Sequence, residues 1–163
     1  MFKTFLIKYG EIGIKGKNRY LFEQALVDQI NFALSRVEGN FHTWREQGRI
    51  YIDAEGLYDF DETVEALQRV FGIVGICPVM KVEDHGLEEL GNEVIDYLAE
   101  VYQMEGKTFK VMTRRARKSY PVESMEVNAY LGGRILDAFP GASVDVHHPE
   151  LMIHVEIREK IYI

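Results

Sequence analysis

Six basic residues and no acidic one lie between Lys107 and Lys118, in a protein of 163 residues whose net charge is −7. Four of the six fall within five positions, in the run Arg114-Arg115-Ala116-Arg117-Lys118. Such a density of like charge repels itself unless an anion is bound nearby. Guanidinium groups bind phosphates through paired hydrogen bonds and stack on unpaired bases. The run therefore predicts a phosphate-binding segment, against the plainer interpretation of an exposed basic turn.

The cations that this prediction assigns to binding are Lys110, Arg114, Arg115, Arg117 and Lys118. Tyr120 follows closely in the chain and is expected to offer an aromatic stacking surface. Affinity that comes from such contacts falls steeply as the salt concentration rises.

A second basic region lies near the N-terminus, where residues 1–20 contain five bases and one acid. Its Gly10–Asn18 segment joins a predicted strand to a predicted helix, as a phosphate-binding loop does. The nucleoside-triphosphate signature is incomplete, because Gly10 lies six positions before Gly16 rather than five and Asn18 replaces the expected Ser or Thr. A structural turn and a loop that contacts phosphates both stay open. The cations of the second interpretation are Lys15, Lys17 and Arg19.

The acidic residues lie elsewhere in the chain. Residues 53–68 hold six carboxylates and residues 83–105 hold eight, without a base in either stretch. An acidic protein with two basic regions can bind a polyanion on one face and stay soluble through the rest of its surface.

The composition excludes several classes of protein. Hydrophobic residues make up 47% and charged residues 28%, which is ordinary for a globular protein and excludes disorder. No apolar run is long enough to span a membrane, and the N-terminus does not resemble a secretory signal. The single cysteine, Cys77, excludes an internal disulfide framework. We expect a cytoplasmic protein that does not contact membranes.

The sequence offers no arrangement of residues for catalysis or metal binding. His147 and His148 are adjacent near Asp145, but neighbouring residues of a strand point to opposite faces. An ordinary loop is the better interpretation, since no metal-ligand spacing accompanies them. We predict no catalytic residue, no metal site and no bound cofactor in this chain.

The first 80 residues predict the element order strand, helix, strand, strand, helix, strand. The strands are expected over 2–9, 41–45, 49–54 and 73–82, and the helices begin at Asn18 and Asp59. The second helix is expected to place Val64, Leu67 and Phe71 on one face. Pro78 favours an edge or an interdomain position for the last strand. This order is that of the ferredoxin-like split βαβ domain.

The second half predicts a helix near Leu87, a strand over 108–113, a loop over 114–121 and a helix capped by Ser124. Strands are expected over 144–146 and 151–157. Gly132-Gly133 weakens the second of these helices, and the close approach of another backbone would explain it. The chain is thus α+β, with domains over 1–76 and 77–163. Because it ends on the apolar run 161–163, we expect it to continue in a longer protein.

Two stretches of sequence resemble a known family. Tyr9–Arg19, followed by Phe22-Glu23, is similar to the N-terminal signature of the tRNA 4-thiouridine synthetases, the tRNA sulfurtransferases of the ThiI family. Phe109–Val111 together with Arg114-Arg115, Lys118, Pro121 and Asn128 resembles the THUMP RNA-binding domain, as do the later stretches around Asp145 and Glu156. The resemblance covers essentially the whole chain and implies a ferredoxin-like domain followed by an α/β THUMP domain.

The family implies an activity that these residues alone cannot perform. Full-length members adenylate a uridine between the acceptor and D stems of tRNA, using ATP and Mg²⁺, and receive sulfur through a cysteine desulfurase. The adenylation motif Ser-Gly-Gly-x-Asp-Ser is absent from this sequence. The resemblance therefore implies tRNA as partner, bound at its acceptor arm and 3′ end, with the cations named above as contacts.

Two alternatives stay open. The THUMP domain could target another tRNA-modifying enzyme, a methyltransferase or a deaminase. The chain could also be a ferredoxin-like regulatory domain that binds a small acidic metabolite through its basic loops. The sequence leaves open whether the chain forms a homodimer.

Overall fold

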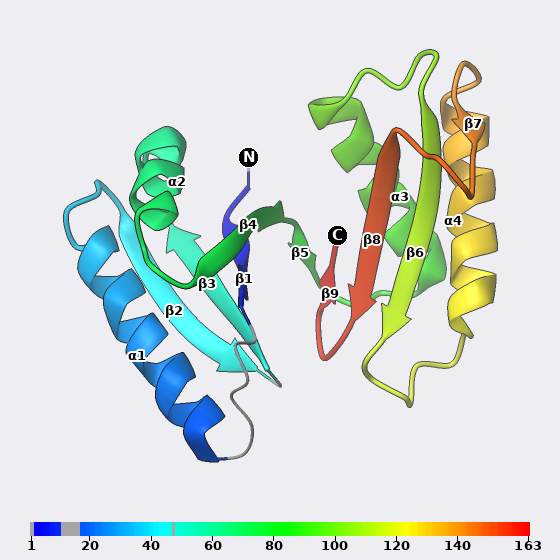
Figure 1. Ribbon diagram of the computed structural model, residues 1–163. Helices are drawn as coiled ribbons and strands as arrows, with labels where there is room; N and C mark the ends of the chain where they lie inside the picture. Colours follow the sequence, from blue (N-terminus) through cyan, green and yellow to red (C-terminus); the bar gives the residue numbers. More distant parts are fainter. Residues whose placement is uncertain (1, 11–16, 47) are drawn as a thin grey trace. The chain divides into compact units, whose positions relative to one another are not determined.

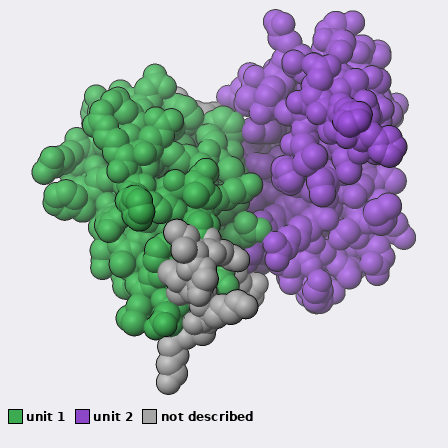
Figure 2. All heavy atoms as spheres, viewed as in Figure 1, with its two compact units in different colours: residues 1–79 green, residues 80–163 purple. Residues whose placement is uncertain are grey.

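The computed structural model describes residues 2–10, 17–46 and 48–163; the side chain of Lys17 is outside this description. The chain divides into two compact units, residues 1–79 and 80–163 (Figure 2). Each unit has its own hydrophobic core and its own sheet.

The first unit is a four-stranded antiparallel sheet with two helices. Its elements are β1 (Thr4–Tyr9), α1 (Lys17–Leu34), β2 (Asn40–Glu46), β3 (Arg49–Glu55), α2 (Phe60–Gln68) and β4 (Ile73–Val79). The strand order is β2-β3-β1-β4, and both helices cover the same face of the sheet (Figure 1). This confirms the predicted ferredoxin-like domain. Pro78 lies on β4, an edge strand of this sheet, and pairs in register with Phe5 of β1.

The helices of this unit form where the sequence favours them. Leu26, Ile30 and Leu34 of α1 recur at helical spacing and are buried against the sheet. The Asp59 carboxylate caps α2 by accepting from the Glu62 N–H at 2.9 Å. The expected position of Phe71 is wrong, because α2 ends at Gln68 and Phe71 lies exposed beyond it.

The second unit is a five-stranded mixed sheet with two helices. Its elements are β5 (Lys81–Val82), α3 (Leu87–Val101), β6 (Thr108–Arg115), α4 (Ser124–Ala138), β7 (Ser143–Val144), β8 (Leu151–Ile157) and β9 (Ile161–Tyr162). The strand order is β5-β9-β8-β6-β7, with β6 parallel to both of its neighbours (Figure 1). Phe109 and Val111 of β6 and Ile153 and Val155 of β8 pack with α3 and α4 in one core.

Several predicted boundaries are wrong for tertiary reasons. The strand expected over 73–82 is two strands, because β4 belongs to the first sheet and β5 to the second. β6 continues through Arg115, two residues past the expected end. Ser124 is the first residue of α4 and the N-cap is Glu123, without a side-chain cap.

The proposed reason for Gly132-Gly133 is also wrong. A Cβ added at either glycine would meet no described atom within 4 Å, so no backbone approaches there. The close approach lies at Gly91 of α3 instead, where an added Cβ would come within 2.7 Å of Arg134 Nη1 on α4. Among the described helices, none is long and apolar enough to cross a membrane.

Candidate nucleic-acid interface

One face of the second sheet carries no helix. β6 and β8 pair in register as Lys110 with Met152, Met112 with His154 and Arg114 with Glu156. Since the alternate residues of both strands are buried in the core, these six side chains turn to the opposite face. We call this surface the open strand face; its residues are Lys110, Met112, Arg114, Met152, His154 and Glu156.

The open strand face combines positive charge with apolar area. Met112 and Met152 are both exposed; Met112 lies between Lys110 and Arg114 on β6, and Met152 lies opposite Lys110 on β8. Lys110 Nζ donates to the Val146 carbonyl oxygen at 3.4 Å, so this ammonium lies toward the segment between β7 and β8. Arg114 is exposed, and its side chain has no hydrogen bond or ion pair with the described part of the chain.

The side chain of Arg115 is bonded within the protein, to the turn between β6 and α4. The same alternation that exposes Arg114 turns Arg115 away from the open strand face. Its Nη1 donates to the carbonyl oxygens of Tyr120, at 2.9 Å, and Val122, at 3.3 Å. Its Nη2 also lies 3.8 Å from Glu123 Oε2. The guanidinium group therefore closes the turn between β6 and α4 from inside.

Arg117 is also engaged within the protein. Its Nη2 lies 2.5 Å from Asp84 Oδ2, and its guanidinium carbon lies 5.5 Å from the centre of the Tyr120 ring. The hydrogen bond from Arg117 holds the pKa of the Asp84 carboxyl below its usual value. Lys118, by contrast, is exposed and forms no ion pair with any residue that the structure describes.

The expected stacking surface at Tyr120 is wrong. Only 3% of Tyr120 is exposed, because its ring is part of the core of the second unit. Burial also raises the pKa of its hydroxyl. The exposed apolar surface near the cations is instead supplied by the two methionines of the open strand face.

The structure thus separates the five cations predicted around β6. Lys110 and Arg114 lie on the open strand face, and Lys118 is exposed in the loop that follows. Arg115 and Arg117 bind carbonyl and carboxylate groups of the protein. That all five contact an anion stays a prediction.

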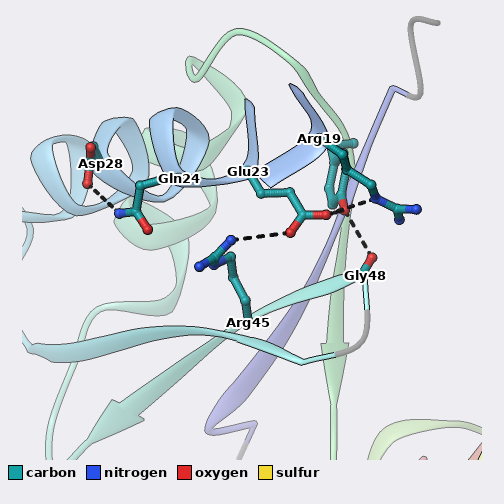
Figure 3. A network of polar contacts seen from close by, with 7 residues as sticks. Arg19, Glu23, Gln24, Asp28, Arg45 and Gly48 are labelled. Atoms are coloured by element: carbon teal, nitrogen blue, oxygen red, sulfur yellow. Dashed lines mark hydrogen bonds and ion pairs between the residues drawn. The ribbon is translucent and has the colours of Figure 1, made fainter. Parts of the chain in front are cut away.

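The N-terminal basic region is described only in part. Lys15 and the segment 11–16 lie outside the described residues, as does the side chain of Lys17. Arg19, in the first turns of α1, donates from Nε to Glu23 Oε1 at 3.0 Å (Figure 3). Because the two basic regions belong to different units, each is a separate candidate contact.

The histidine pair is part of a turn. The Asp145 carboxylate accepts from the backbone N–H groups of His147 and His148, each at 3.0 Å. These two bonds hold the pKa of Asp145 below its usual value. No group of three or more His, Cys, Asp or Glu side chains within the described ranges is placed to bind a metal ion.

Family models match both units. Residues 4–77 match the ThiI ferredoxin-like domain, and residues 85–163 match the THUMP domain.

Similar full-length proteins are longer than this chain. A probable tRNA sulfurtransferase of Lachnospira eligens is 61% identical over 97% of this chain and 40% of that protein. The corresponding protein of Agathobacter rectalis is 55% identical over 100% of this chain and 41% of that protein. The chain thus spans about two fifths of the length of these relatives.

A solved structure is similar over the whole chain. It is a crystal structure of a 4-thiouridine synthetase in complex with RNA and with bound ATP. The TM-score is 0.79 at 31% identity, covering 99% of this chain and 40% of that one.

Proposed function

Because the chain belongs to the ThiI family, of which it carries the ferredoxin-like and THUMP domains, we propose that it is the tRNA-binding part of a tRNA sulfurtransferase. The observation that carries the proposal is the open strand face, where Lys110 and Arg114 flank the exposed Met112 and the exposed Met152 lies beside Lys110. Phosphates of a single strand bind to the cations, and unstacked bases pack on the apolar side chains between them. Lys118 adds a third cation close in sequence.

The proposed target is the acceptor arm of tRNA with its single-stranded 3′ end. Single-stranded ends present bases that a flat protein surface can contact, whereas the deep major groove of an RNA helix hides them. The cations of the open strand face bind phosphates whichever base is attached to them. The proposed recognition therefore depends on RNA shape and phosphates more than on base sequence.

In the proposed reaction this part positions a uridine of tRNA for the rest of the protein, which would make 4-thiouridine. Adenylation with ATP and Mg²⁺ and sulfur delivery from a cysteine desulfurase would depend on residues outside this chain. We further propose that the protein acts in the cytoplasm, where tRNA is modified. Arg114, Lys110 and Lys118 take part only by binding and orienting the RNA.

The test is binding of this chain to whole tRNA and to the same tRNA lacking its 3′ single-stranded end, each at two salt concentrations. We expect salt-sensitive binding that is at least about tenfold weaker for the trimmed tRNA, because several phosphate and stacking contacts are lost. Equal binding to both RNAs would remove end recognition and leave a general polyanion binder. No binding to either would contradict the proposal and favour the metabolite-binding alternative.

A further inference from the structure

A buried carboxylate in the first unit lies between two arginines. Glu23 of α1 is only 7% exposed. Its Oε1 accepts from Arg19 Nε at 3.0 Å, and its Oε2 lies 3.5 Å from Nη1 of Arg45, at the end of β2. Figure 3 places Glu23 between the two guanidinium groups, which approach it from different elements.

Glu23 faces two arginines, although one would be enough to neutralise its charge. The Tyr9 hydroxyl already donates to Oε1 at 2.6 Å, so Tyr9 and Arg19 together compensate for the burial of the carboxylate. Arg45 brings a second positive charge to the same carboxylate, through its Nη1. A guanidinium has five N–H donors in a planar fork, so Arg45 can bind a further anion while its Nη1 faces Glu23.

Both guanidinium groups are held in place while they reach the solvent. The guanidinium carbon of Arg45 lies 4.4 Å from the centre of the Tyr20 ring, a cation–π contact that helps to hold it in place. Arg19 lies against the β2–β3 turn, because a Cβ added at Gly48 would come within 2.6 Å of its Nη2. The side chains of Arg19 and Arg45 are nevertheless 43% and 25% exposed.

We infer that Glu23 is a positioning residue, which holds Arg19 and Arg45 as a pair that binds the phosphate backbone of tRNA. This inference rests on the proposed function and adds a second contact, in the first unit, to the open strand face of the second. Two preorganised guanidinium groups lose little side-chain entropy when they bind a phosphate, which makes each hydrogen bond more favourable. The sequence pattern indicates Arg19 as a phosphate contact, whereas no local pattern indicates a role for Glu23 or Arg45.

The decisive variant is Glu23→Gln, measured for tRNA affinity and for thermal unfolding. Glutamine keeps an oxygen that accepts from Tyr9 but removes the charge that holds the arginines. Deleting a negative charge beside bound RNA should by itself strengthen binding, whereas loss of positioning weakens it. We expect tRNA affinity to fall about three- to tenfold despite the more positive net charge. Glu62→Gln, an exposed residue of α2 with the same change of charge, is the control and should bind as tightly as the wild type or slightly tighter.

A second variant keeps the inference testable if Glu23→Gln does not fold. Arg45→Ala leaves Glu23 bonded to Tyr9 and Arg19. We expect it to reduce the slope of log K against log salt concentration by about 0.7 to 0.9, the value of one phosphate contact. An unchanged slope would show that Arg45 meets no phosphate and would overturn the inference.

The outcomes separate this inference from the proposed function. If the wild-type chain does not bind tRNA, both fail together. If the wild type binds while Glu23→Gln binds as well or better, the positioning role is wrong and the proposed function stands. If Glu23→Gln weakens binding and Glu62→Gln does not, at equal thermal midpoints, the positioning role is confirmed.

Discussion

Arg117 donates to the Asp84 carboxylate, 33 residues earlier in the chain, across 2.5 Å from Nη2 to Oδ2. This ion pair fastens the loop after β6 to the segment that precedes α3. A residue of the most basic run in the sequence is thereby bound to the protein's own acidic stretch. Within this run, the cations that remain exposed to solvent are Arg114 and Lys118.

The double variant Arg114→Ala with Lys118→Ala should weaken tRNA binding about tenfold or more, because two phosphate contacts are lost. Thermal unfolding should not change, since neither side chain is bonded to the described part of the protein. Fluorescence anisotropy with labelled tRNA measures the affinity. The control is Arg36→Ala with Arg69→Ala, which removes the same charge from two exposed positions of the first unit, just after α1 and just after α2. Equal losses in the two double variants would contradict a role for the open strand face.

Arg115→Ala should mainly lower stability. The carbonyl groups of Tyr120 and Val122 lose their donor, and the half-buried turn before α4 opens. We expect the free energy of unfolding to fall by about 1 to 3 kcal/mol, as for hydrogen bonds to a charged group. Urea unfolding checks this. Full stability combined with weaker tRNA binding would instead assign Arg115 to the RNA.

Asp84→Asn should destabilise the second unit in a pH-dependent way. The folded pKa of Asp84 is lowered by Arg117, so the pair stabilises the fold above the unfolded pKa of about 4 and loses this effect as pH falls through the folded pKa. The variant should be less stable than the wild type by about 1 kcal/mol at pH 7 and at pH 5. The difference should shrink progressively as pH falls below about 4 and through the lowered folded pKa. A difference that stays constant from pH 7 to pH 3 would show that the carboxylate charge does not matter.

Gly133→Ala should stabilise the protein by about 0.5 to 1 kcal/mol, because alanine favours the helix and the added Cβ meets open space. Gly91→Ala makes the same chemical change in α3 but drives a Cβ toward the Arg134 guanidinium. That guanidinium bonds to Asn92 and to the Glu88 carbonyl across the α3–α4 contact. We therefore expect Gly91→Ala to be less stable than Gly133→Ala. Thermal unfolding of both variants gives the comparison, and equal gains would contradict it.

Local patterns in the sequence predict most of the elements. The Asp59 cap and the acidic first turn of α2 act within four residues, so the start of that helix could be predicted. The alternation from Phe109 to Thr113 likewise gives the buried and exposed sides of β6. The order of the first six elements then restricts the fold, since short connections allow few arrangements of a sheet with two helices.

The binding surface could be predicted only as a region. Whether Arg117 is exposed depends on Asp84, and whether Tyr120 is exposed depends on a core built from several distant elements. Neither relationship has a local signal. If the predicted strand had continued through Arg115, it would have placed Arg114 and Arg115 on opposite faces of the sheet, because successive strand residues alternate between the faces. The Glu23–Arg45 pair joins residues 22 positions apart on a helix and a strand, which no spacing rule indicates.

We expect the pairing of β5 with β9 to be a slow step in the folding of the second unit, because it joins the two ends of that unit. Met80 and Ile163 exchange both backbone hydrogen bonds, at 3.0 and 2.9 Å, so the first and last residues of this unit are neighbours. Contacts between residues so far apart in sequence must overcome a large loop-closure entropy before they stabilise anything. During synthesis the edge of β5 therefore stays unpaired until the whole unit has left the ribosome. We expect this strand, rather than the local helices, to set the folding time of the second unit.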